Sequence, residues 1–179
     1  PICAILAGAV SLIILLCGFK TIDRNKDWKN DYTLFSHDIE VVPNSFLVNA
    51  NVASTLVNMS DLERDENKRK ADLNRGVALF SKAISMQNTY VLGYMNRAVA
   101  YLKLGQPDSM IMDLNRIKEL YPIHPQLPEM YFYAGQAYLS GGQPGKGYSV
   151  MQTILSLRPD YQPARYALHK LDSMGIKPL

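Results

Sequence analysis

Seven identities at one constant distance constrain the fold of this chain more than any other feature. Each of these residues recurs 37 positions later, within two segments of helical length. The first members of the pairs are Tyr101, Leu102, Gly105, Gln106, Pro107, Leu120 and Pro122. A fixed period of this kind indicates a repeat architecture, in which each unit packs on its neighbours. With 47% hydrophobic and 20% charged residues, the chain can also bury a core and is not disordered.

The aromatic, small and proline residues of each copy resemble those of tetratricopeptide (TPR) repeats, which are helix pairs of about 34 residues. One unit is marked by Tyr94, Ala98, Tyr101, Gly105, Met110, Leu114 and Pro122. The next is marked by Tyr131, Gly135, Tyr138, Gly142, Gly147, Met151 and Pro159. The three extra residues fall in the loop around residues 123–128, where an insertion costs little. The resemblance implies an all-α solenoid of antiparallel helix pairs.

A further unit precedes these two and carries an insertion. We predict its first helix at residues 46–59, and Gly76, Phe80 and Ala83 occupy positions of its second helix. The inserted residues 61–75 hold five acidic and five basic side chains, which favours a solvated loop with a helical extension. Residues 31–42 and 163–174 should each add one helix at the ends of the array, giving about eight helices after the N-terminal segment.

Residues 2–19 form 18 consecutive uncharged positions in which Ser11 is the only polar side chain. As a helix they would span roughly 27 Å, close to the thickness of about 30 Å of a hydrocarbon core, so we predict a transmembrane helix. A cleaved signal peptide is the main alternative, although no basic residue precedes Ile2 and the run exceeds the usual apolar stretch of such peptides. Both cysteines, Cys3 and Cys17, lie in this run, so the remaining residues hold no disulfide framework and no zinc cluster.

This pattern divides the chain into six expected segments. They are a transmembrane helix at 1–20, a junction with a first helix at 21–45, TPR units at 46–90, 91–127 and 128–161, and a closing helix with its tail at 162–179. Pro1 stands where an initiator methionine would, and we expect the chain to be the C-terminal part of a longer protein.

The junction resembles a more specific family. Its matching residues are Arg24, Asn25, Trp28, Leu34, Phe35, Pro43, Ser45 and Asn51. They look like the junction of the transmembrane-and-TPR O-mannosyltransferases and their bacterial relatives, in which a multi-span glycosyltransferase carries a C-terminal TPR array. The resemblance covers residues 19–53, with the repeats following. It implies catalysis in a membrane domain outside this chain, so it assigns no catalytic residue here.

The membrane topology has two conflicting indications. Four basic residues, Lys20, Arg24, Lys26 and Lys29, follow the apolar run, and the positive-inside rule would place the repeats in the cytoplasm. The family resemblance places them on the lumenal or periplasmic side. We follow the resemblance, because membrane helices upstream can override a local charge bias.

The sequence shows no evident residues with which the chain itself could catalyse a reaction. His37, His124 and His169 are widely separated, and the chain contains no Gly-rich phosphate loop and no HExxH or GxSxG motif. We therefore expect no catalytic residue, no cofactor and no metal site. The formal charge of +3, from 19 basic and 16 acidic residues mixed along the chain, also gives no reason to expect a nucleic-acid partner.

The first helices of TPR units line a concave face, and their positions here predict a peptide-binding groove. Its expected residues are Asn51, Met95, Asn96, Val99, Phe132, Tyr133 and Gln136. Lys103 is the only basic residue on this face, whereas a clamp for an acidic tail needs several. Apolar and amide side chains instead suit an extended apolar or uncharged peptide. Alternatively, Met95 and Phe132 simply pack against neighbouring helices.

Three functional hypotheses follow. The leading one is a noncatalytic, membrane-tethered TPR module that binds a protein or extended peptide for an upstream glycosyltransferase. The second is a single-pass TPR adaptor that scaffolds a cell-envelope complex. The hydropathy of the upstream reading frame would distinguish these two hypotheses. The third is that the chain itself catalyses transfer, and no residue of the sequence supports it.

Overall fold

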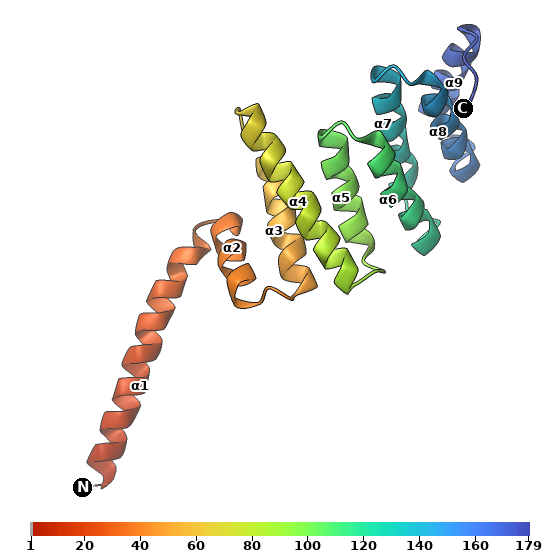
Figure 1. The fold of residues 1–179 in the computed structure, drawn as a ribbon. Coiled ribbons are helices and arrows are strands. Elements are labelled where there is room, and N and C mark those ends of the chain that lie inside the picture. Colours follow the sequence, from red (N-terminus) through yellow and green to blue (C-terminus); the bar gives the residue numbers. More distant parts are fainter. Residues whose placement is uncertain (1) are drawn as a thin grey trace.

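The computed structural model describes residues 2–179, which are built from helices and the loops between them (Figure 1). The helices are α1 (Ile2–Arg24), the short 3₁₀ helix η1 (Asn25–Lys29), α2 (Asp31–Val41), α3 (Phe46–Met59), α4 (Glu66–Met86), α5 (Val91–Lys103), α6 (Pro107–Leu120), α7 (Leu127–Ser140), α8 (Pro144–Leu157) and α9 (Gln162–Ser173). The expected all-α class is thus confirmed. Pro1, which prompted the expectation of a longer parent chain, lies outside the described residues.

Helices α2 to α9 stack in chain order, and α1 projects away from them (Figure 1). Each helix of the stack contacts the next, which is the pattern of a solenoid. In addition, α3 contacts α5 and α5 contacts α7. The first helices of the three helix pairs therefore lie beside one another and share one face of the array.

The repeated sequence forms a helix stop followed by a helix start. Gly105 has φ +69°, a left-handed conformation that glycine adopts without strain. The N–H of Gln106 donates to the carbonyl of Tyr101 at 2.9 Å, which closes the end of α5 as a Schellman motif. Pro107 then occupies the first position of α6, where no N–H is needed. The second copy repeats the same bonds around Gly142, with φ +71°, between α7 and α8.

Small residues let the helices of a pair approach closely. A Cβ atom added to Gly135 on α7 would lie 2.6 Å from Met151 Cε on α8. On α8, a Cβ added to Gly147 would lie 2.6 Å from Leu139 Cδ2 and 3.3 Å from the carbonyl oxygen of Gly135. These two glycines therefore set the spacing of the last helix pair.

Two clusters of buried apolar side chains fill the array. The larger one joins α4 to α9 and includes the fully buried Leu114, Ile117, Leu127, Ala134, Met151 and Ile154. The smaller one lies mainly between α3 and α4 and includes Ala53, Leu73, Phe80 and Ala83. Burial of these side chains is the main stabilising contribution to the stack.

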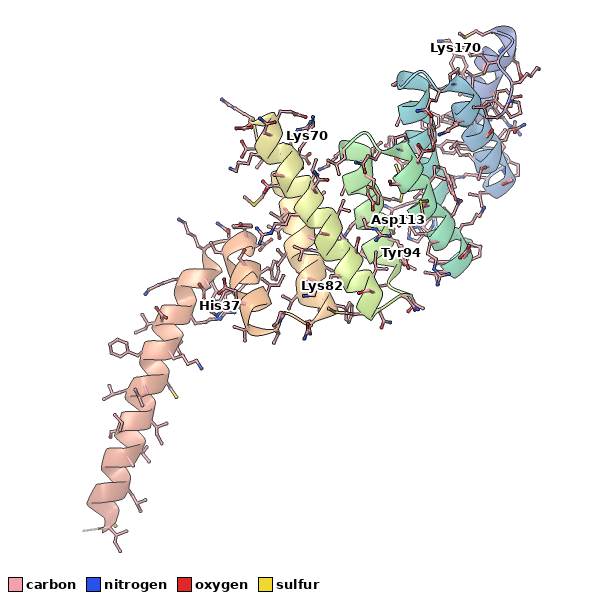
Figure 2. The ribbon with its side chains drawn as sticks, in the orientation of Figure 1. His37, Lys70, Lys82, Tyr94, Asp113 and Lys170 are labelled. Atoms are coloured by element: carbon pink, nitrogen blue, oxygen red, sulfur yellow. The ribbon has the colours of Figure 1, made fainter. Side chains whose placement is uncertain are left out.

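The insertion at residues 61–75 consists of a loop and the first turns of a longer helix. The Asp65 side chain caps α4 by accepting the backbone N–H groups of Asn67 and Lys68, at 2.9 and 3.2 Å. In the next turns, Glu66 forms ion pairs with Arg69 and Lys70. Local capping and charge pairs thus extend α4 beyond its packed part, at the tip marked by Lys70 in Figure 2.

Helix α1 is apolar and makes no contact with the core. Within the described residues, one helical segment, Leu6–Lys29, is long and apolar enough to cross a membrane, and none of its most apolar window is buried. A signal sequence near an N-terminus meets the same criteria of length and hydropathy.

A polar cluster connects α1 to the array. Arg24, the last residue of α1, forms ion pairs with Asp27 of η1 and Asp38 of α2. His37 Nδ1 lies 3.8 Å from the Asp27 carboxylate, beside the end of α1 (Figure 2). Thr33 Oγ1 donates to the Asp27 carbonyl at 2.8 Å. These contacts hold η1 against α2, so the connection is a folded corner rather than an extended linker.

Candidate functional site

The predicted groove residues lie on three first helices. Asn51 is on α3, Met95, Asn96 and Val99 are on α5, and Phe132, Tyr133 and Gln136 are on α7. Tyr133 and Gln136 are exposed, whereas the others are half-buried. Because α5 contacts both α3 and α7, these residues belong to neighbouring helices.

Several of these side chains are already engaged within the fold. Asn96 Nδ2 donates to Ser54 Oγ on α3 at 3.3 Å, which joins two first helices. Met95, Val99 and Phe132 pack against the larger core. The Tyr133 hydroxyl donates to Glu129 Oε1 at 2.9 Å, one turn earlier on α7. The parts that remain accessible to a ligand are therefore fewer than the sequence pattern suggests.

The sequence pattern suggests that Lys103 could pair with a ligand, but its ammonium group is already bonded within the fold. Its Nζ donates to the Val57 carbonyl at 3.0 Å and to Asp61 Oδ1 at 2.7 Å. Val57 lies in the last turn of α3, where free carbonyl groups attract a cation. The charge of Lys103 thus stabilises the contact between α3 and α5.

A large accessible groove lies at the C-terminal end of the array, between α7, α8 and α9. Its volume is about 670 Å³, and its walls are mainly apolar. The structure brings two predicted residues, Phe132 and Gln136, into this groove and adds Tyr166 and Lys170 from α9. Asn51, Met95, Asn96, Val99 and Tyr133 do not line it.

The residues of α9 were missed because the sequence pattern was interpreted only as a closing helix. Pro163, Tyr166, Lys170 and Met174 are spaced by three or four residues, so they share one helical face. Tyr166 is 73% exposed and Met174 is 63% exposed, although both are large apolar side chains. The same spacing, read from the sequence, would have indicated a second apolar face on this helix.

Buried tyrosines of α7 tie two helix pairs together through bonds to α6. Tyr131 on α7 is 1% exposed, and its hydroxyl donates to Asn115 Oδ1 on α6 at 2.6 Å. Burial raises the pKa of Tyr131 to about 12. Tyr138 donates to Asp108 Oδ1 at 2.8 Å, and burial followed by this bond raises its pKa as well. These hydroxyl groups serve packing and remain protonated at neutral pH.

The histidines do not form a reactive cluster. His37 lies at the corner between α1 and α2, and His124 packs its ring edge-on against Tyr121 in the loop before α7. Across residues 2–179, no group of three His, Cys, Asp or Glu side chains is arranged to hold a metal ion.

The comparisons with known proteins agree with this fold. A family model described as tetratricopeptide repeat matches residues 93–124, which include most of α5 and all of α6. The crystal structure of MamA protein aligns with 95% of this chain and 85% of its own, with 16% identity and a TM-score of 0.60. TTC0263, a thermophilic TPR protein of Thermus thermophilus, aligns over 76% and 68%, with 17% identity and a TM-score of 0.54. The fold is thus that of TPR proteins, and the family model identifies a tetratricopeptide repeat at residues 93–124.

A curated relative makes the resemblance more specific. The chain is 24% identical to the human Protein O-mannosyl-transferase TMTC3 over 182 residues, which include 95% of this chain. It spans only 19% of the length of that relative. The similarity to this protein O-mannosyltransferase therefore includes most of the junction and the repeats of this chain.

Proposed function

We propose that the chain is a membrane-tethered TPR module that binds a protein partner and forms the noncatalytic C-terminal part of a multi-span glycosyltransferase. The observation that carries this proposal is the order of the elements. An apolar helix runs through a short folded corner directly into a TPR array, and similarity to the human O-mannosyltransferase extends over both parts.

The tether rests on the properties of α1. Its exposed apolar side chains, including Leu12, Ile13, Ile14 and Leu15, are each more than half accessible. Such a surface is unfavourable in water and is stable in a lipid environment. Trp28 is 67% exposed just beyond this helix, and exposed aromatic side chains are typical of the ends of membrane spans.

The binding role rests on the array itself. Helices α3, α5 and α7 share a face, and the groove beside α9 is open. Solenoids present extended surfaces of this kind to other proteins. We assign Asn51, Met95, Asn96, Val99, Phe132, Tyr133 and Gln136 to the face that the partner contacts, on the lumenal or periplasmic side of the membrane.

Tethering and partner binding can be tested separately. Deletion of residues 1–22 should release the array into the aqueous fraction, whereas the full chain should stay with membranes after alkaline extraction. A full chain that is soluble without detergent would exclude the tether. For topology, a cysteine in place of Lys170, which is exposed, should react with a membrane-impermeant maleimide from the lumenal or periplasmic side only.

Partner binding can be tested with a photo-crosslinking residue. Benzoylphenylalanine replaces Tyr133, on the proposed face, in cells that express the full chain. The matched control is Tyr121, which is 43% exposed like Tyr133 but lies outside this face. Protease-sensitive adducts should form from position 133 and not from position 121. Equal adducts from both positions, or none, would contradict the assignment of the face.

A further inference from the structure

The groove between α7 and α9 contains two polar side chains that the fold leaves unengaged. Gln136 on α7 and Lys170 on α9 both line it, and both are exposed. Among residues 2–179, neither side chain has a hydrogen bond or an ion pair with another residue. Lys103, in contrast, is bonded to the Val57 carbonyl and the Asp61 carboxylate. The groove therefore offers an amide and a cation that remain free for a ligand.

The apolar walls of the groove are arranged around these two groups. Phe132 and Leu139 come from α7, and Tyr166 and Met174 come from α9 and its end. Phe132 is fixed by an edge-on contact with Tyr161, with ring centroids 5.8 Å apart. Tyr166 and Met174 are mostly exposed. An apolar ligand would thus meet one rigid wall and one wall whose side chains can adapt to it.

The charge of the chain is concentrated at this end of the array. Residues 141–179 contain five basic residues and two acidic ones, whereas residues 1–140 contain equal numbers of both. The formal charge of +3 therefore belongs to the segment that includes α8 and α9. Lys170 lies on α9 at the C-terminal end of the array, as Figure 2 shows. A field of this sign favours an acidic ligand over a neutral or basic one.

We propose that the groove between α7 and α9 binds a short extended peptide that carries two bulky apolar side chains next to a carboxylate. The apolar side chains lie between Phe132 and Tyr166, the carboxylate pairs with Lys170, and the Gln136 amide bonds the peptide backbone. This inference rests on the proposed function and gives its ligand a location and a chemistry. It also differs from the uncharged peptide expected from the sequence, because Lys170 lies outside the face that the sequence predicts.

An array of short synthetic peptides tests this recognition directly. Two adjacent positions carry every pair of Leu, Ile, Phe, Tyr and Trp, and the following position carries Asp, Asn or Lys. The full chain, purified in detergent, should bind the Asp peptides most strongly and the Lys peptides least. Lys170→Glu should invert this order, because the sign of the interaction changes while the apolar walls stay. Tyr166→Ala should weaken binding about tenfold for all peptides.

Lys118→Glu on α6 is the matched control, since it makes the same charge change away from the groove. It should keep the order of the wild-type chain, and all variants should keep its melting temperature. Absence of binding to every peptide, or an order that Lys170→Glu leaves unchanged, would overturn the inference. If crosslinks from position 133 persist in that case, only the groove assignment fails. If they are also absent, the proposed binding function fails with it.

Discussion

Arg97 on α5 and Asp113 on α6 form a bidentate ion pair inside one helix pair. The Nε–Oδ2 distance is 2.9 Å and the Nη2–Oδ1 distance is 2.5 Å. The third arm of the guanidinium donates to Ser81 Oγ on α4 at 2.8 Å, which connects the pair to the preceding unit. The guanidinium also lies over the ring of Tyr94, at 5.6 Å from its centroid. Figure 2 labels Tyr94 and Asp113 between these helices.

Loss of one partner of this pair should destabilise the array strongly. The Asp113 and Arg97 side chains are only 4% and 17% exposed, so Asp113→Ala leaves a largely desolvated cation without a counter-charge. We expect the free energy of unfolding to fall by about 3 kcal/mol in urea titrations of the full chain in detergent. The double variant Arg97→Met with Asp113→Leu should be much closer to wild type. Equal losses in the single and double variants would contradict this account.

Overpacking between α7 and α8 should also be costly. A Cβ at Gly135 already meets the flexible end of Met151, and the larger side chain in Gly135→Leu would extend toward Val150. We expect a loss of about 1–3 kcal/mol in the free energy of unfolding. Lys170→Ala, at an exposed position without a bonded partner among the described residues, should change it by less than about 0.5 kcal/mol. An unchanged melting temperature for Gly135→Leu would show that the two helices can separate freely.

The helix stop at Gly142 can be tested by its backbone conformation. With φ +71°, a Cβ there is strained even though it would meet no neighbour within 4 Å. Gly142→Ala should therefore cost about 1 kcal/mol. Gly142→Asn should cost less, since asparagine tolerates the left-handed region better than alanine. Thermal unfolding followed by circular dichroism would show the order, and equal melting temperatures for both variants would argue against backbone strain.

Alkaline pH should destabilise the array through Tyr131. Its pKa is about 12 in the folded chain, compared with 10.0 for an unperturbed tyrosine. The unfolded chain thus loses this proton first, and the contribution to stability is complete below pH 10 and is lost as the pH rises toward 12. Tyr131→Phe should remove a slope of at most about 1.4 kcal/mol per pH unit from a plot of stability against pH. Parallel plots for the variant and the wild type over this range would refute the assignment.

The sequence predicted the helices well because their ends are encoded locally. Gly105 and Pro107 specify the end of one helix and the start of the next through the conformation of their own turn, without help from distant residues. The helix predicted at residues 46–59 is α3, with the same bounds. Capping by Ser45, whose side chain accepts the N–H of Val48, is equally local.

The site was less predictable because its determinants come from residues far apart in sequence. Asp61 engages Lys103 across 42 positions, and no local pattern indicates that this lysine is occupied. Arg97 and Asp113 lie on different helices, and no sequence motif singles them out. Prediction of the groove beside α9 requires the position of Lys170 relative to Gln136. The periodicity of either helix alone does not give that position.

The folded corner at Arg24 limits how far the array can move relative to α1. Only six residues, the five of η1 and Asn30, separate α1 from α2. Asp27 of this connection is bonded by Arg24 and Thr33, and Arg24 also pairs with Asp38 of α2. A flexible linker of that length would let its ends sample separations of roughly 12 Å, whereas a bonded helical turn gives little slack. If α1 spans a membrane, the face proposed to bind a partner is held at a nearly fixed height above the bilayer. Its encounters with membrane-bound ligands become a search within a thin layer, and ligands at other heights are excluded by geometry alone.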